Sequence, residues 1–138
     1  MPPQTKISLT LIVLLFFSQT ILSQGLSKFN KDSLLHLLTT IQEADSKVKI
    51  LNDLAYIEQF NEPQKGLNYA NIALKISDST HNLNGLAISN AMLGLNNATL
   101  GNLKEAIKFE NEALKTYQKI RRSKRYSRNA QQFIDCIY

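Results

Sequence analysis

PQKGLNYANIALK (residues 63–75) and LKEAIKFENEALK (residues 103–115) align with each other without gaps, at a spacing of 40 residues. The residues that recur unchanged are Asn71, Ala73, Leu74 and Lys75, as Asn111, Ala113, Leu114 and Lys115. The near-equivalents are Gly66, Leu67 and Tyr69, which recur as Ala106, Ile107 and Phe109. Repetition at a fixed period predicts supersecondary units that stack on one another and share a continuous core. A stacked array acts by presenting an extended surface to a partner.

Apolar residues recur at helical spacing on both sides of this repeat, and we expect no strands. Asp32 is the expected cap of a first helix and Asp45 the expected cap of a second. Pro63 suits the first turn of a third helix, and a fourth runs from about residue 83 to Leu100. Gly101 is expected to end the fourth helix, because glycine readily adopts the left-handed conformation. A fifth helix then runs from Leu103 to about Ile120, and a sixth begins near Arg125.

Small residues lie where two helices of a hairpin are expected to approach closely. Gly66 and Ala106 lie early in the second helix of each pair, and Ala55 and Gly94 lie late in the first. Without bulky side chains, paired helices can approach to about 8–10 Å. Asn96 is expected nearer the surface. The predicted packing residues are Leu54, Ala55, Gly66, Ala73, Leu93, Gly94, Ala106 and Ala113.

The N-terminus is typical of a secretory signal peptide. Lys6 precedes an apolar stretch from Ile7 to Phe17, and small or polar residues follow as far as Gly25. An uncleaved anchor is the alternative, but a bilayer span needs about 20 apolar residues. We therefore expect residues 1–25 to be a signal peptide that is cleaved after Ser23 or after Gly25, and the protein to be exported. It would be membrane-associated if the segment is retained or a downstream span exists.

Charge and cysteine content limit the classes of partner. The net charge of +5 comes from one basic block, residues 115–128, with Lys115, Lys119, Arg121, Arg122, Lys124, Arg125 and Arg128. Such a block can bind nucleic acid or anionic lipid, or it can simply be a solvated helix end. Because an exported protein is separated from the nucleic acid of the cytoplasm, we do not expect nucleic acid as its partner. Cys136 is the only cysteine, so no internal disulfide forms and packing alone must stabilise the domain.

The repeated stretches resemble the tetratricopeptide repeat (TPR) in its long-repeat variant. One unit carries Leu51, Leu54-Ala55, Gly66-Leu67 and Ala73-Leu74, and the next carries Leu93-Gly94, Leu100-Gly101-Asn102, Ala106-Ile107 and Ala113-Leu114. The resemblance implies an all-α solenoid of stacked antiparallel hairpins. Residues 26–44 would form a linker and capping helix, 45–80 and 83–121 two repeats, and 125–138 the first helix of a third. The family usually has a large aromatic residue where Glu58 and Asn97 stand.

The chain also resembles the N-terminal, extracytoplasmic repeat regions of bacterial TPR sensor proteins. LNDLAYIEQF and NGLAISNAMLGLNNATLGN carry this second resemblance. The output modules of such sensors, a histidine kinase or a transcription regulator, are not in the sequence. The final FIDCIY leaves apolar residues without a second helix to cover them, which favours either a longer protein or self-association through this end.

No pattern in the sequence indicates catalysis or a cofactor. His36 and His81 lack other ligands at metal-binding spacing, and the glycines form no phosphate-binding loop. We therefore expect a non-catalytic protein–protein interaction module, with a sensory fragment of a membrane signalling protein as the alternative. Its partner would be a protein or peptide, without cofactor or metal. The resemblance places six residues on the concave, partner-binding face: Lys49, Asn52, Tyr56, Gln59, Ala91 and Leu95. For Ala91 and Leu95, packing between repeats is the competing interpretation.

Overall fold

The computed structural model describes residues 31–135, and every regular element in that range is an α-helix. A helical segment spans residues 31–40, and α2 (Ala44–Glu58), α3 (Pro63–Ser79), α4 (Leu83–Thr99) and α5 (Leu103–Asp135) follow. Side chains are described for residues 31–128 and for Gln132. The all-α fold class is confirmed. The predicted signal peptide, residues 1–25, and the final residues 136–138 lie outside the described range.

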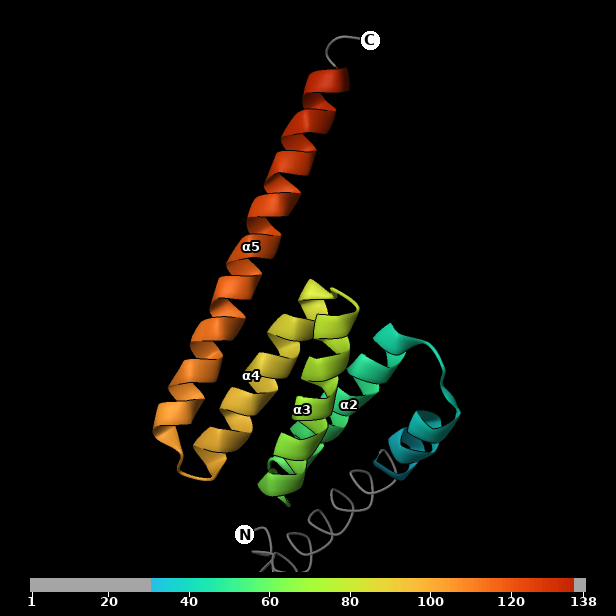
Figure 1. The fold of residues 1–138 in the computed structure, drawn as a ribbon, viewed down its shortest axis with the longest axis vertical. Coiled ribbons are helices and arrows are strands. Elements are labelled where there is room, and N and C mark those ends of the chain that lie inside the picture. The colour runs from blue at the N-terminus through green and yellow to red at the C-terminus, as the bar shows by residue number, and fades with distance from the viewer. Residues whose placement is uncertain (1–30, 136–138) are drawn as a thin grey trace, which may run out of the picture.

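The four labelled helices lie side by side in chain order, and each runs antiparallel to the one before it (Figure 1). α3 packs between α2 and α4, α5 packs against α4, and α2 also contacts α4. The segment 31–40 joins this body through Leu38, which packs on the buried residues Val48, Leu51 and Ala73. The described core is therefore a row of helix pairs rather than a closed bundle.

The turns that follow α3 and α4 have the same geometry. Both helices contain 17 residues, and each is followed by one residue in the left-handed region, His81 (φ 54°) and Gly101 (φ 79°). The next residue, Asn82 or Asn102, donates its backbone N–H to a carbonyl five residues earlier. Such a turn satisfies the free carbonyls at a helix end and reverses the chain tightly. Gly101 thus ends α4 in the predicted conformation.

The predicted helix caps at Asp32 and Asp45 are wrong. Asp32 lies inside the helical segment 31–40, and α2 is capped by Glu43. The Glu43 carboxylate accepts hydrogen bonds from the backbone N–H groups of Asp45 (3.0 Å) and Ser46 (2.7 Å). Asp45 instead accepts a 2.7 Å hydrogen bond from the side-chain Nδ2 of Asn82, which joins the start of α2 to the start of α4. α2 therefore begins two residues earlier than a cap at Asp45 would place it, and a different pair of amides is capped.

The predicted break between a fifth and a sixth helix, near Arg125, is also absent. α5 continues without interruption from Leu103 to Asp135. Residues 116–135 contain neither glycine nor proline, and arginine, lysine and glutamine are good helix formers, so a basic block alone does not end a helix. Because α5 has 33 residues and α4 only 17, the C-terminal half of α5 extends past the other helices (Figure 1).

The residues predicted to pack between helices are all buried. They are Leu54, Ala55, Gly66, Ala73, Leu93, Gly94, Ala106 and Ala113. Asn96 was expected near the surface, but it is fully buried. Its Nδ2 donates to the carbonyls of Met92 (2.9 Å) and Ala55 (3.2 Å), and its side chain lies directly over Gly66. The absence of a side chain at Gly66 makes room for this amide, which links α4 to α2.

Candidate functional site

The first helices of the two hairpins, α2 and α4, are equivalent at a spacing of 39 residues. Leu54 and Ala55 of α2 correspond to Leu93 and Gly94 of α4, and all four are buried. Between equivalent positions the second hairpin, Gly94 to Ala106, is one residue longer than the first, Ala55 to Gly66, which explains why the second helices repeat at 40 residues instead. Equivalent residues on these two contacting helices face the same side of the molecule.

On this side, α2 presents a pair of aromatic rings to solvent. Tyr56 and Phe60 pack edge to face, with ring centroids 5.9 Å apart and an interplanar angle of 90°. The residues remain 53% and 75% exposed. Two turns before Tyr56, Lys49 forms an exposed ion pair with Asp53 at 3.3 Å. Exposed aromatic rings with a polar rim are typical of protein-binding surfaces.

Two of the predicted partner-binding residues do not reach solvent. Asn52 is 5% exposed and Gln59 is 4% exposed. Asn52 lies on the same helical face as Val48 and Ala55, which pack into the core. α2 is covered by α3, by α4 and by the segment 31–40, so its buried face is wider than that of an ordinary surface helix. The prediction that Asn52 and Gln59 offer side chains to a partner is therefore corrected.

α4 contributes partly buried apolar residues to the same side. Ala91 and Leu95 are intermediate in exposure, whereas Ile88, the equivalent of Lys49, is 40% exposed. We define the first-helix face by the residues that α2 and α4 present there: Lys49, Tyr56, Phe60, Ile88, Ala91 and Leu95. Phe60 and Ile88 were not predicted from the sequence. The four-residue spacing of Tyr56 and Phe60 and the equivalence of Ile88 to Lys49 are the signals that could have identified them.

The two positions where the TPR family usually has an aromatic residue are buried and polar here. Glu58 is fully buried and forms an ion pair with Lys31 at 2.6 Å. Asn97, its equivalent in α4, donates to the carbonyl of Leu93 (2.9 Å) and accepts from Nδ2 of Asn102 (3.3 Å). These partners fix the segment 31–40 against α2 and the turn after α4, so both residues have a structural role.

A shallow cleft of ≈ 450 Å³ lies between the start of α2, the α3–α4 turn and α5. Its polar lining includes Asp45, His81, Asn82 and Lys124. The hydroxyls of Thr80 and Ser123 also line it. Asp45 and Asn82 are paired with each other, and the Thr80 hydroxyl donates to the backbone carbonyl of Ile76 at 3.0 Å.

Three ionisable groups in the part of the chain that the structure describes have shifted pKa values, and all three are exposed. Hydrogen bonds from the Ser46 side chain and backbone lower the pKa of Glu43. The Lys65–Glu62 hydrogen bond (2.8 Å) lowers the pKa of Glu62 and raises that of Lys65. These shifts arise from a helix cap and a surface ion pair, so they do not mark a buried reactive group.

Among residues 31–135, no three or more His, Cys, Asp or Glu residues gather in a way that could hold a metal ion. Within the same range, no helix combines the length and the apolar character needed to cross a bilayer.

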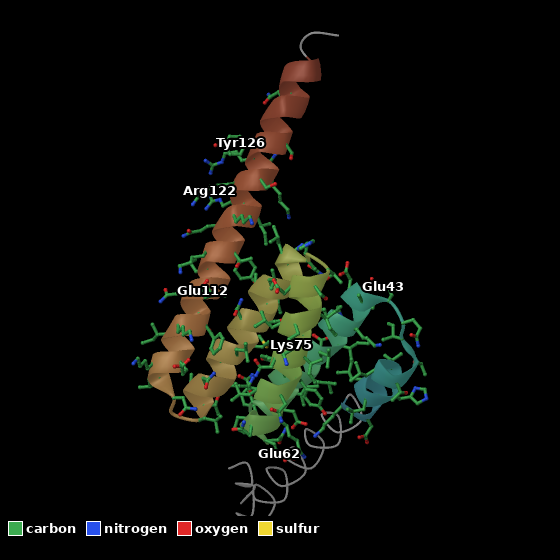
Figure 2. All side chains as sticks on the ribbon, in the orientation of Figure 1. Glu43, Glu62, Lys75, Glu112, Arg122 and Tyr126 are labelled. Carbon is green, nitrogen blue, oxygen red and sulfur yellow. The ribbon has the colours of Figure 1, made fainter. Side chains whose placement is uncertain are left out.

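The basic block lies on the extending half of α5. Residues 121–128 are all exposed, and Figure 2 shows Arg122 and Tyr126 on the part of the helix that extends past α4. Lys115 pairs with Glu112 at 2.7 Å, closer to the body. The face predicted for self-association, formed by the last apolar residues of the chain, falls largely on side chains outside the described part. α5 thus carries charges of both signs in its N-terminal half and a run of cations over residues 119–128.

No protein-family model, curated protein or solved structure matches this chain.

Proposed function

We propose that this protein is a non-catalytic protein-binding module, built as a short TPR-like solenoid. The equivalence between the hairpins α2–α3 and α4–α5 supports the proposal most directly. Leu54 and Leu93 are buried at equivalent positions, and so are the pairs Ala73 and Ala113. Stacked hairpins of this kind expose one helix of each unit on a common face, which is suited to binding an extended segment.

The first-helix face is the proposed binding surface. Tyr56 and Phe60 provide rigid apolar area, and aromatic residues contribute strongly to the energy of protein interfaces. Ile88 and Leu95 extend the apolar surface onto α4, and Lys49 provides a charge at its edge. A peptide with two apolar side chains, one for the aromatic pair and one for α4, fits this arrangement.

The proposal includes export, which the apolar stretch 7–17 and the small residues after it support. Expression of the full chain with a C-terminal tag, followed by N-terminal sequencing of the recovered protein, tests this part. We expect a start close to residue 26. An intact N-terminus at Met1 in the cytoplasm contradicts export but leaves the binding proposal standing.

A selection from a displayed peptide library against the immobilised protein tests the binding function. We expect enriched peptides to share an apolar pattern, and their binding to fall at least about tenfold in the Tyr56→Ala/Phe60→Ala variant. Because both rings are exposed, the melting temperature should change little. The matched control is Asn71→Ala/Lys75→Ala, two exposed residues of α3. A selection that enriches no common pattern, or peptides whose binding ignores Tyr56 and Phe60, refutes the proposed surface.

A further inference from the structure

α3 and α5 carry equivalent residues, but only α3 has a helix on each side. Five positions of α3 form one stripe, at spacings of three and four residues: Pro63, Leu67, Ala70, Leu74 and Ser77. None of them is exposed, and Ala70 and Ser77 are fully buried. Leu93 of α4 packs on Ala70, with Leu67 and Leu74 beside it. Gly85 of α4 lies against Ser77. α4 therefore covers this stripe from Leu67 to Ser77.

On α5 the same five positions are open. We call Leu103, Ile107, Glu110, Leu114 and Tyr117 the open stripe of α5. The four apolar members are 64%, 63%, 55% and 45% exposed, in chain order. In the described residues α5 packs only against α4, which covers its other face through Ala106, Phe109 and Ala113. The open stripe is thus a largely apolar helix face, and α4 covers the equivalent face of α3.

We propose that the open stripe of α5 binds an amphipathic helix of another protein, antiparallel to α5 and acidic at its N-terminal end. This inference deepens the proposed protein-binding function by assigning a second surface and a partner chemistry to it. The form of the ligand follows from α4, which is the helix that covers the equivalent stripe of α3. Helices that lay an apolar face into such a groove bind through residues spaced by three and four.

The acidic end of the ligand follows from the charges beyond the stripe. Three exposed arginines continue the face of the open stripe toward the C-terminus of α5: Arg121, Arg125 and Arg128. They follow Tyr117 at spacings of four, four and three residues, and we call them the arginine line. A helix placed as α4 is placed on α3 starts beside this arginine line and ends beside Leu103. Acidic residues in its first turns meet the arginines and also suit the positive end of their own helix dipole.

Glu110 argues against a second copy of this chain as the ligand. It stands at the centre of the open stripe, where α3 has Ala70, and its side chain lies over Gly94. A two-fold pairing of two open stripes brings the two Glu110 carboxylates together at the middle of an apolar interface. Two carboxylates facing each other are destabilising, and partly burying them adds a desolvation cost. A different helix, with a hydrogen-bond donor opposite Glu110, avoids this conflict.

A labelled peptide derived from α4 tests the proposal with the full chain. The probe has the sequence of residues 83–99, carries Leu93→Gln to supply a donor for Glu110, and begins with a run of glutamates. Fluorescence anisotropy should show saturable binding, at roughly micromolar Kd. Ile107→Asp/Leu114→Asp should raise the Kd at least about tenfold, and Arg121→Ala/Arg125→Ala about threefold or more, with a weaker salt dependence. Moving the glutamates to the C-terminal end of the probe should also weaken binding.

Lys108→Ala/Lys115→Ala is the matched control, because it makes the same change in charge on the solvent-facing side of α5 and should leave the Kd unchanged. Absence of binding to the wild-type chain, or equal binding by the aspartate variant, overturns the proposal. Sedimentation of the chain alone provides the other decisive outcome, since a dimer that Ile107→Asp/Leu114→Asp dissociates makes a second copy the ligand. The α4-derived probe can fail to bind while Tyr56→Ala/Phe60→Ala still abolishes binding of the selected peptides. In that case the proposed function stands, and only the open stripe of α5 is refuted as a binding surface.

Discussion

α3 and α5 contain nearly the same residue pattern but have different surroundings. Leu74 and Leu114 occupy equivalent positions in the repeated Asn-x-Ala-Leu-Lys sequence, yet Leu74 is partly buried against α4 and Leu114 is 55% exposed. Ala73 and Ala113, one residue earlier, are buried in both helices. The repeat therefore specifies two packing faces on each helix, and the neighbours present decide whether each face is covered.

This difference separates residues that stabilise the fold from residues available to a partner. On α3, both faces contribute to the free energy of unfolding, because both are removed from water. On α5, only the face that includes Ala106 and Ala113 does so. The apolar side chains on the other face contribute little until a ligand covers them. Equivalent substitutions in the two helices test this division directly.

The largest expected difference comes from placing an aspartate at the equivalent leucines. Leu74→Asp should lower the free energy of unfolding by at least about 3 kcal/mol, because a charge replaces apolar packing between α3 and α4. Leu114→Asp should cost no more than about 1 kcal/mol, chiefly through helix propensity. Urea unfolding followed by circular dichroism measures both. Similar losses in the two variants contradict the assignment of Leu114 to an open face.

The second prediction compares two of the glycines at helix contacts, Gly66 and Gly94. A Cβ atom on Gly66 meets the buried Asn96 side chain and lies 3.0 Å from the carbonyl oxygen of Ala55. Gly66→Ala should therefore cost about 1–3 kcal/mol despite the better helix propensity of alanine. The atoms nearest to a Cβ on Gly94 belong to the side chain of Glu110, which is exposed and can rotate away. Gly94→Ala should stay within about 0.5 kcal/mol of the wild type.

A double variant sharpens this prediction. Asn96→Ala removes the side chain that Gly66→Ala would meet, so the cost of Gly66→Ala should be smaller in the Asn96→Ala background than in the wild type. The coupling free energy between residues in contact is typically about 0.5–3 kcal/mol. Additive losses in thermal or urea unfolding contradict the close approach of residues 66 and 96.

Sequence patterns predicted the helices and their small packing residues, but they failed where polar residues are buried. The alignment of residues 63–75 with 103–115 located the buried alanines, and the conformational preference of glycine located the end of α4 at Gly101, because both signals act locally. Asn52 and Asn96 were misplaced because an amide reads as a surface residue unless its neighbours are known. Asn96 is satisfied by a carbonyl 41 residues away in the chain, and no local pattern reports such a contact.

Two helix boundaries, the start of α2 and the end of the helix that begins at Leu103, were missed for a different reason. Asp45 and Glu43 are both acidic residues near the start of α2, and the choice between them depends on which carboxylate reaches the free amides. Within the basic block, charge density suggested a break, although the residue types favour a continuous helix. The open stripe of α5 was also invisible in sequence, because the identical pattern on α3 is covered.

The third prediction compares the two left-handed turn residues. Nothing lies within 4 Å of a Cβ placed on Gly101, so Gly101→Ala tests the conformational cost alone. We expect a loss of about 1 kcal/mol, since an L side chain disfavours positive φ. His81 already bears that cost, and His81→Gly should raise the free energy of unfolding by up to about 1 kcal/mol. Changes of the same sign in both variants contradict the equivalence of the two turns.

The smallest expected effect concerns pH and the caps of the first helices. The Glu43 carboxylate caps α2, whereas the neutral side chain of Asn82 caps α4 by accepting from the backbone N–H of Gly85 at 2.8 Å. Hydrogen bonds from the Ser46 side chain and backbone lower the pKa of Glu43 below its ordinary value of 4.5. A lowered pKa in the folded state means that the cap is fully formed above that ordinary value and is lost as pH falls through the folded value. Hydrogen-exchange protection of the Asp45 and Ser46 amides should therefore decrease in acid, while protection of the Gly85 amide should not.

Glu43→Gln removes the titrating group, so protection of the two α2 amides should become independent of pH over the same range. A parallel loss at Gly85, or an unchanged acid response in the Glu43→Gln variant, shows that general acid unfolding rather than this cap is responsible.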